Sequence, residues 1–185
     1  MVSIGSVWLA ILVSAAVVWV VSAIVWMVLP HHKKDFRALP DEAAAIATLR
    51  AQNLQPGRYN FPHLRSPAEM KEEATRRKFE EGPAGYLTVV PRGAPGMAKP
   101  MVIQFVAYIV IGGIVAYVAT RTLPAGAEYL KVFQITGTVA FMAYGLGTVQ
   151  DAIWFGRPWS DIGKGLFDAF LYGSFTGGVF GWLWP

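Results

Sequence analysis

The sequence contains no cysteine among its 185 residues. This absence excludes disulfide bonds, iron–sulfur clusters, thiolate metal sites and covalently attached c-type haem. A phosphate-binding loop is missing as well. The turn-rich segments 82–85 and 91–96 lack both the Gly-Lys-Ser/Thr ending and the spacing of a dinucleotide-binding loop. We therefore expect no bound cofactor and interpret both segments as connectors.

Charged residues are few and unevenly distributed. Asp, Glu, Lys and Arg make up only 15% of the chain, and the formal net charge is +4. Most of the basic residues and most of the acids lie between residues 31 and 100. In a membrane protein, a basic excess on one soluble segment marks the cytoplasmic side, so we expect no nucleic-acid partner.

Long apolar runs, by contrast, are abundant. Apolar residues make up 54% of the chain and the mean hydropathy is +0.40, values typical of integral membrane proteins. The first run, 7–29, is long enough to cross a bilayer. No Lys or Arg precedes it, whereas a cleaved signal peptide begins with a basic region, so we expect an anchor. Further spans are predicted at 101–120, 132–150 and 166–184.

These runs predict an all-α membrane fold, a four-helix transmembrane bundle with a small α+β insertion between the first and second spans. The predicted domains are the first transmembrane helix (1–30), the cytoplasmic α+β segment (31–100) and transmembrane helices two to four (101–185). Orientation follows from the basic residues near the span ends, because these favour the cytoplasm. One side carries Lys33, Lys34, Arg37, Arg50, Arg92, Lys99, Arg157 and Lys164, and the other carries Arg121 and Lys131. We therefore predict a multi-pass protein with both termini outside and residues 31–100 in the cytoplasm.

The basic flank that follows the first span begins with two adjacent histidines. Lys33, Lys34 and Arg37 are expected to contact lipid headgroups. His31 and His32 are residue types that bind metals, but no third ligand lies near them at helical spacing. We interpret the pair as a solvated flank and predict no metal site.

The soluble segment contains signals for two helices and two strands. Asp41 is expected to cap a helix that ends near residue 53, and Ser66–Glu69 has the residue types of a capping box for a second helix. Strands are predicted at 58–61 and 86–90. Large apolar side chains are scarce, so we expect the segment to lean on a partner or on the membrane helices.

Small residues recur at every fourth position of the last predicted span. They are Gly165, Ala169, Gly173, Gly177 and Gly181. Such a row lets two helix backbones approach closely in a membrane. Two interpretations remain open: packing against the second or third span of the same chain, and docking to another subunit or to a second copy.

Two acids, Asp151 and Asp168, flank the turn between the last two predicted spans, together with Arg157 and Lys164. We interpret these four residues as an intramembrane charge cluster that holds the hairpin at the headgroup level. At such a wet surface each pair contributes about 1 kcal/mol or less. The alternative is a proton or cation path through both acids. Ser160 is expected to cap the last helix and has no nucleophile context.

The terminal hairpin carries the run Asp-Ala-Ile-Trp-Phe-Gly-Arg-Pro-Trp at 151–159 and ends Phe-Gly-Trp-Leu-Trp-Pro at 180–185. It resembles the end of a family of uncharacterised four-span bacterial inner-membrane proteins. The resemblance covers the spans and not residues 31–100. It implies a four-span architecture in a bacterial inner membrane, and no catalytic residues.

No nucleophile, metal cage or cofactor loop is evident, so we expect a protein that is not an enzyme. The favoured function is a non-catalytic accessory subunit that packs in a larger membrane assembly, such as a respiratory or photosynthetic complex. Its partners would be membrane lipids and other subunits or a second copy. The alternative is a small homo-oligomeric transporter or channel that uses Asp151 and Asp168. Such a transporter would be expected to show an internal repeat, and the first two spans do not mirror the last two.

Overall fold

The computed structural model describes residues 2–94 and 96–185, which form two compact units. We call residues 2–35 and 96–185 the helical unit, and residues 36–94 the insertion. The predicted segment, 31–100, is longer than the insertion by five residues at its start and six at its end. The difference arises because the residues that follow the first helix pack within the helical unit, and because the next long helix begins before residue 100.

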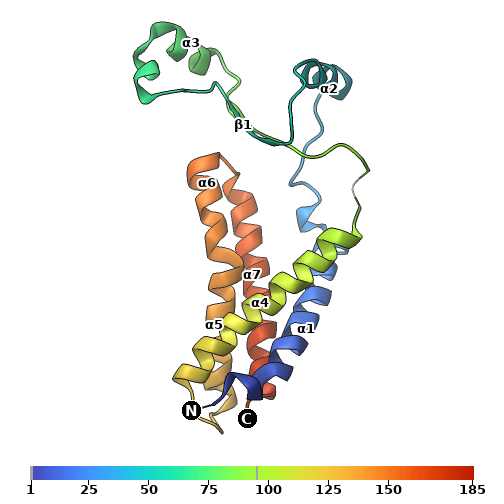
Figure 1. Cartoon of the computed structure of the whole chain (residues 1–185), viewed down its shortest axis with the longest axis vertical. Coiled ribbons are helices and arrows are strands. Elements are labelled where there is room, and N and C mark those ends of the chain that lie inside the picture. The colour runs from blue at the N-terminus through green and yellow to red at the C-terminus, as the bar shows by residue number, and fades with distance from the viewer. Residues whose placement is uncertain (1, 95) are drawn as a thin grey trace. The chain divides into compact units, whose positions relative to one another are not determined.

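The helical unit is built from four long helices, and Figure 1 shows its two termini at the same end. Its elements are η1 (Ile4–Val7), α1 (Trp8–Met27), η2 (Pro30–His32), α4 (Ala98–Thr122), α5 (Tyr129–Gly145), η4 (Leu146–Thr148), α6 (Val149–Phe155) and α7 (Trp159–Trp182). α7 contacts α5 along most of its length and also packs against α1, while α4 packs against α1 and α5.

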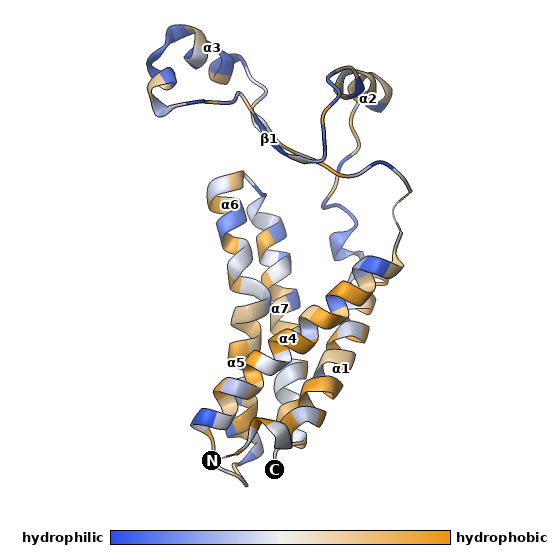
Figure 2. Ribbon diagram, viewed as in Figure 1, coloured by the Kyte–Doolittle hydropathy of each residue, from blue (hydrophilic) through white to orange (hydrophobic). Residues whose placement is uncertain are grey.

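Three helical stretches are long and apolar enough to cross a membrane: Ile4–Met27, Ala98–Thr122 and Tyr129–Phe155. Figure 2 shows the apolar colouring of these helices. The chain is therefore a mostly helical protein with the spans of a membrane protein. α7 is also long enough, with 24 residues, but Asp161, Lys164, Asp168 and its many glycines lower its hydropathy. The fourth span thus remains a prediction.

α5 and α7 pack backbone against backbone. A Cβ atom built on Gly173 would lie 2.8 Å from the carbonyl oxygen of Gly137, and one built on Gly177 would lie 2.9 Å from that of Phe133. Real Cβ atoms do not approach other atoms so closely, so only glycine fits at these positions. Thr136 is fully buried beside this seam, and its hydroxyl donates to the Val132 carbonyl, which satisfies the polar group within its own helix.

Four members of the small-residue row contact α5 of the same chain. Besides Gly173 and Gly177, Ala169 lies against Gly145, and Gly181 lies against the ring of Tyr129. Gly165 is different, because nothing lies within 4 Å of the position its Cβ would occupy. These contacts correspond to the first of the two interpretations of the row, packing within the chain.

The insertion contains α2 (Glu42–Ala51), β1 (Gly57–Phe61), η3 (Pro67–Lys71), α3 (Glu73–Glu81) and β2 (Gly85–Val89). β1 and β2 form an antiparallel pair in which Gly57 lies opposite Val89. This element order agrees with the order expected from the sequence. Asp41 caps α2 as predicted, because its Oδ1 accepts from the Ala44 amide at 2.9 Å.

The predicted capping box at Ser66 is wrong. The Ser66 side chain makes no capping hydrogen bond, and Glu69 accepts instead from the Arg65 amide at 3.1 Å. The expected second helix is divided into η3 and α3, because Glu72 between them has an extended backbone. Ser160 does not cap α7 either. Pro158 occupies the N-cap position, and the Ser160 hydroxyl donates to Asp161.

Candidate functional site

A short turn at the end of α1 holds the two adjacent histidines. Leu29 leaves the helix in an extended conformation, and Pro30 begins the 3-10 turn η2, where its fixed φ suits the first helical position. The Lys33 amide closes the turn by donating to the Pro30 carbonyl at 3.1 Å. His31 and His32 are thus held on a compact turn directly after the first membrane-crossing helix.

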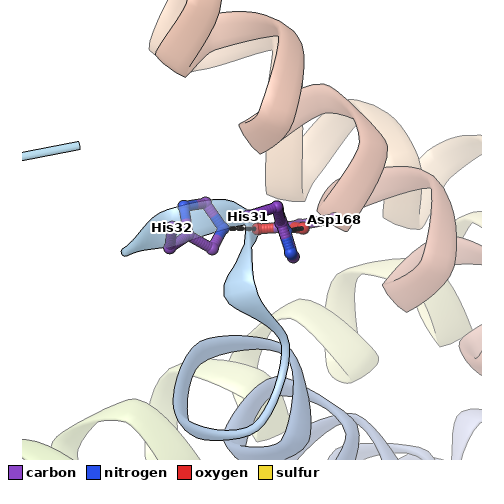
Figure 3. A group of neighbouring side chains, drawn as sticks. All are labelled: His31, His32 and Asp168. Carbon is purple, nitrogen blue, oxygen red and sulfur yellow. Dashed lines mark hydrogen bonds and ion pairs between the residues drawn. The ribbon is translucent and has the colours of Figure 1, made fainter. Parts of the chain in front are cut away.

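Both imidazoles meet the carboxylate of Asp168, which projects from α7 (Figure 3). His31 Nε2 lies 3.0 Å from Asp168 Oδ1, and His32 Nε2 lies 2.7 Å from Asp168 Oδ2. Asp168 is only 4% exposed and His32 only 8% exposed. A contact between residues 136 positions apart in sequence therefore joins the end of α1 to α7.

A second set of contacts holds His32 from its other side. Its Nδ1 lies 2.6 Å from Asp35 Oδ2, and the Lys164 ammonium donates to the other oxygen of Asp35. The indole of Trp26 stacks on the His32 ring at a centroid distance of 3.9 Å. We call His31, His32, Asp35, Lys164 and Asp168 the histidine–aspartate cluster. Each of its polar side chains has a partner, as buried polar groups require.

The electrostatics of the cluster follow from these contacts. Burial lowers the pKa of His32, but hydrogen bonds to Asp35 and Asp168 and their charges raise it by more, so the pKa lies above its usual value. The hydrogen bond from Lys164 lowers the pKa of Asp35 below its usual value, and the hydrogen bond from His32 acts in the same direction. Since both ring nitrogens of His32 face carboxylates, the contacts favour its doubly protonated, charged form.

The interpretation of the histidines as a solvated flank is wrong, because His32 is buried and both rings face Asp168. The third potential ligand, Asp168, is not near the histidines in sequence, because it belongs to α7. Only the predicted topology could have indicated this contact. The span prediction placed His31, His32 and Asp168 at the same membrane face, although no local spacing connects them.

The predicted four-residue charge cluster is divided in two. Asp151 pairs with Arg157 at 3.7 Å, and both side chains are exposed. Lys164 and Asp168 belong to the buried histidine–aspartate cluster instead. The expectation that Asp168 lies at a wet surface, where its pairs contribute little, is therefore wrong. Lys33, Lys34 and Arg37 are exposed, and their contact with lipid headgroups stays a prediction.

Three tyrosine rings, those of Tyr108, Tyr144 and Tyr172, pack together inside the helical unit. The ring of Tyr144 packs edge-on against the rings of Tyr108 and Tyr172, each at 5.6 Å between centroids. Tyr172 follows Asp168 by one helical turn. The Tyr172 and Thr176 hydroxyls are both buried. The interior next to the cluster is thus polar as well as aromatic.

Comparison of the chain with protein-family models, curated proteins and solved structures finds no match. We therefore infer the function from the residues and from their geometry.

Proposed function

We propose that this protein is a non-catalytic accessory subunit of a larger assembly in a bacterial inner membrane, such as a respiratory or photosynthetic complex. The observation that carries the proposal is the burial pattern of the insertion. Every described residue between 36 and 94 is exposed or half-buried. A segment of this length that forms no buried core is expected to be stabilised by a surface outside itself.

The insertion also offers an apolar surface to a partner. A groove of about 620 Å³ lies between α2 and β2, lined by Ile46, Leu49, Leu54, Leu87, Thr88, Val89 and Val90, with Arg50, Asn53 and Arg92. Exposed and half-buried aliphatic side chains bordered by basic ones suit an amphipathic, acidic segment of another subunit. The occupant we propose is therefore a protein segment that presents apolar and acidic side chains.

The architecture that we propose has four spans, with α7 as the fourth. Both termini lie at one end of the helical unit, as an even number of crossings requires (Figure 1). α5 and α1 pack against the side of α7 that carries Asp168, so this acid is buried. Other positions of α7 expose large apolar side chains that suit contact with lipid, namely Phe167, Phe170 and Phe175. We propose that the termini are periplasmic and that the insertion is cytoplasmic, as the basic residues favour.

The alternative function, a homo-oligomeric transporter or channel, uses Asp151 and Asp168 on one path. Asp151 is exposed and pairs with Arg157, whereas Asp168 is buried and pairs with two histidines. Since the two acids have separate partners, this arrangement favours the accessory subunit.

The test is extraction of the full chain from its native membrane in a mild detergent, followed by native sizing and identification of companion chains. We expect a companion in a fixed ratio. Replacing Ile46 with Asp in the groove is expected to release it, because a charge would enter an apolar contact.

The matched control is Leu39→Asp, which places the same charge on another exposed aliphatic residue of the insertion, outside the groove. This variant is expected to keep the companion. A full-length chain that elutes as a lone monomer, or a companion retained by Ile46→Asp, would contradict the proposal.

A further inference from the structure

We propose that His31, His32 and Asp168 form a binding site for one divalent transition-metal ion. The site goes beyond the proposed subunit function and does not depend on it. The three residues offer two imidazole nitrogens and one carboxylate oxygen. These ligand atoms all lie within 4.8 Å of one another. Two imidazoles and one carboxylate are a common donor set for such ions.

The spacing of the donor atoms is close to what an ion requires. The two His–Asp distances are 3.0 and 2.7 Å. Ligands bound about 2.1 Å from an ion are separated by about 3.0 Å when at right angles and about 3.4 Å in a tetrahedron. Small rotations of the three side chains would therefore let both Nε2 atoms and one Asp168 oxygen bind the same ion.

The surroundings of His32 are those of a metal ligand. A histidine that binds a metal through one ring nitrogen donates the other N–H to a carboxylate or carbonyl, which fixes the orientation of the ring. His32 Nδ1 makes this contact with Asp35 at 2.6 Å, and Lys164 in turn holds Asp35. The stacked Trp26 indole fixes the plane of the same ring. His32 Nε2 is thus aimed at the site before any ion arrives.

The charge of the site also favours a cation. The Lys164 ammonium pairs with Asp35 and lies 3.9 Å from Asp161, while the Asp168 carboxylate faces the two histidines. An ion binds only neutral imidazoles, so His32 releases a proton when the ion binds. The three carboxylates and the Lys164 ammonium then leave two negative charges without a compensating charge. A bound dication would balance them, and the low exposure of His32 and Asp168 would strengthen its attraction to the carboxylate.

Access and coordination number indicate the kind of site. The His31 side chain is 26% exposed, which leaves a route for the ion, whereas the His32 and Asp168 side chains are each 5% exposed. With nitrogen and oxygen donors and no thiolate, the set suits Zn²⁺, Fe²⁺ or Mn²⁺. An ion bound to all three groups would cross-link the turn after α1 to α7.

The experiment uses the full-length protein in detergent, stripped with a chelator and titrated with Zn²⁺ by calorimetry. We expect one Zn²⁺ per chain, and X-ray absorption of the loaded protein should show two imidazole ligands. Asp168→Asn and His32→Gln remove a ligand. Both variants are expected to weaken Zn²⁺ binding by more than about 100-fold. Loss of a ligand should cost more than loss of a residue that only hydrogen-bonds to a ligand, which costs about 10- to 100-fold.

A positioning variant distinguishes the proposed role of Asp35. Asp35→Asn is expected to weaken Zn²⁺ binding by about 10- to 100-fold while the two-imidazole absorption signature is retained. The matched controls are His63→Gln, which removes the third histidine of the chain, and Asp151→Asn, which removes the exposed acid. Both controls should bind Zn²⁺ like the wild type.

Several results would overturn the proposal. The wild-type chain could fail to bind Zn²⁺, Fe²⁺ or Mn²⁺ at micromolar concentrations, which would identify the cluster as an ion-pair network only. Fewer than two imidazoles in the absorption spectrum of the wild-type protein would have the same meaning, and this measurement does not depend on any variant folding. Loss of binding in His63→Gln would place the ion elsewhere.

Discussion

The helical unit and the insertion belong to one chain but differ in how they are stabilised. Every buried residue of the described chain lies in the helical unit, and none lies between residues 36 and 94. The helical unit combines backbone contact along α5 and α7 with a buried polar cluster between η2 and α7. The insertion has a two-stranded sheet and two short helices, which are marginal structures on their own. The difference teaches that buried contacts hold the helical unit together, whereas residues 36–94 have no buried core of their own.

The largest effect is expected from bulk in the seam between α5 and α7. Gly177→Leu places a side chain where a Cβ alone would lie 2.9 Å from the Phe133 carbonyl oxygen. Because both backbones must separate, we expect a destabilisation on the order of 3 kcal/mol, at the upper end for overpacking. Thermal unfolding of the detergent-solubilised protein should show a melting temperature lower by roughly 10 °C.

The matched control for Gly177→Leu is Gly165→Ala in the same helix. Nothing lies within 4 Å of the added methyl group, and alanine favours a helix over glycine by about 1 kcal/mol. The melting temperature should stay equal or rise slightly. If the two variants unfolded at the same temperature, the seam would not be the main source of stability in the helical unit.

A smaller loss of stability is expected when the buried acid Asp168 is replaced. Asp168→Asn removes the charge that both histidines contact, and partners left unpaired in a buried site cost about 2–3 kcal/mol. Urea or thermal unfolding in detergent at neutral pH measures the change. Asp151→Asn is the control, because its exposed pair with Arg157 contributes at most about 1 kcal/mol. Equal losses in both variants would contradict the assignment of one buried and one exposed acid.

Removal of the insertion should affect the helical unit less than either substitution. Replacing residues 36–95 with a flexible Gly/Ser linker of about a dozen residues leaves every buried contact of the helical unit in place. We expect its melting temperature to change by a few degrees at most, roughly 1 kcal/mol. Helix content by circular dichroism and monodisperse elution in detergent would check that the helices remain assembled. A shortened chain that aggregates would show that the insertion stabilises the helices.

The smallest effect is expected within the insertion itself. Ile46→Asp lies on a surface already exposed to solvent, so the stability of the isolated protein should change by about 0.5 kcal/mol or less. Thermal unfolding of the purified chain measures this, separately from the companion assay. A large destabilisation would mean that the groove is part of a core, which would reduce the contrast between the two units.

Helices and strands were predictable where local patterns decide them. The apolar runs predicted α1, α4 and α5 because a membrane-crossing helix needs only length and hydropathy. Asp41 predicted its helix start because a cap acts within a few residues. The capping box predicted at Ser66 is wrong because the backbone there does not follow the local residue types. An extended residue at Glu72 breaks the helix, and the local residue types do not reveal it.

By itself, the sequence determined three features: helices apolar enough to cross a membrane, a polar segment with few large apolar residues between the first two of them, and a row of small residues in the last helix. Only the tertiary structure decided that this row faces α5, and that His31 and His32 meet an acid 136 or more residues away. Hydropathy and capping act between neighbours in sequence, so they can be read from it. The partners of a buried charge are set by which helix faces come together, and that depends on the packing of the whole helical unit.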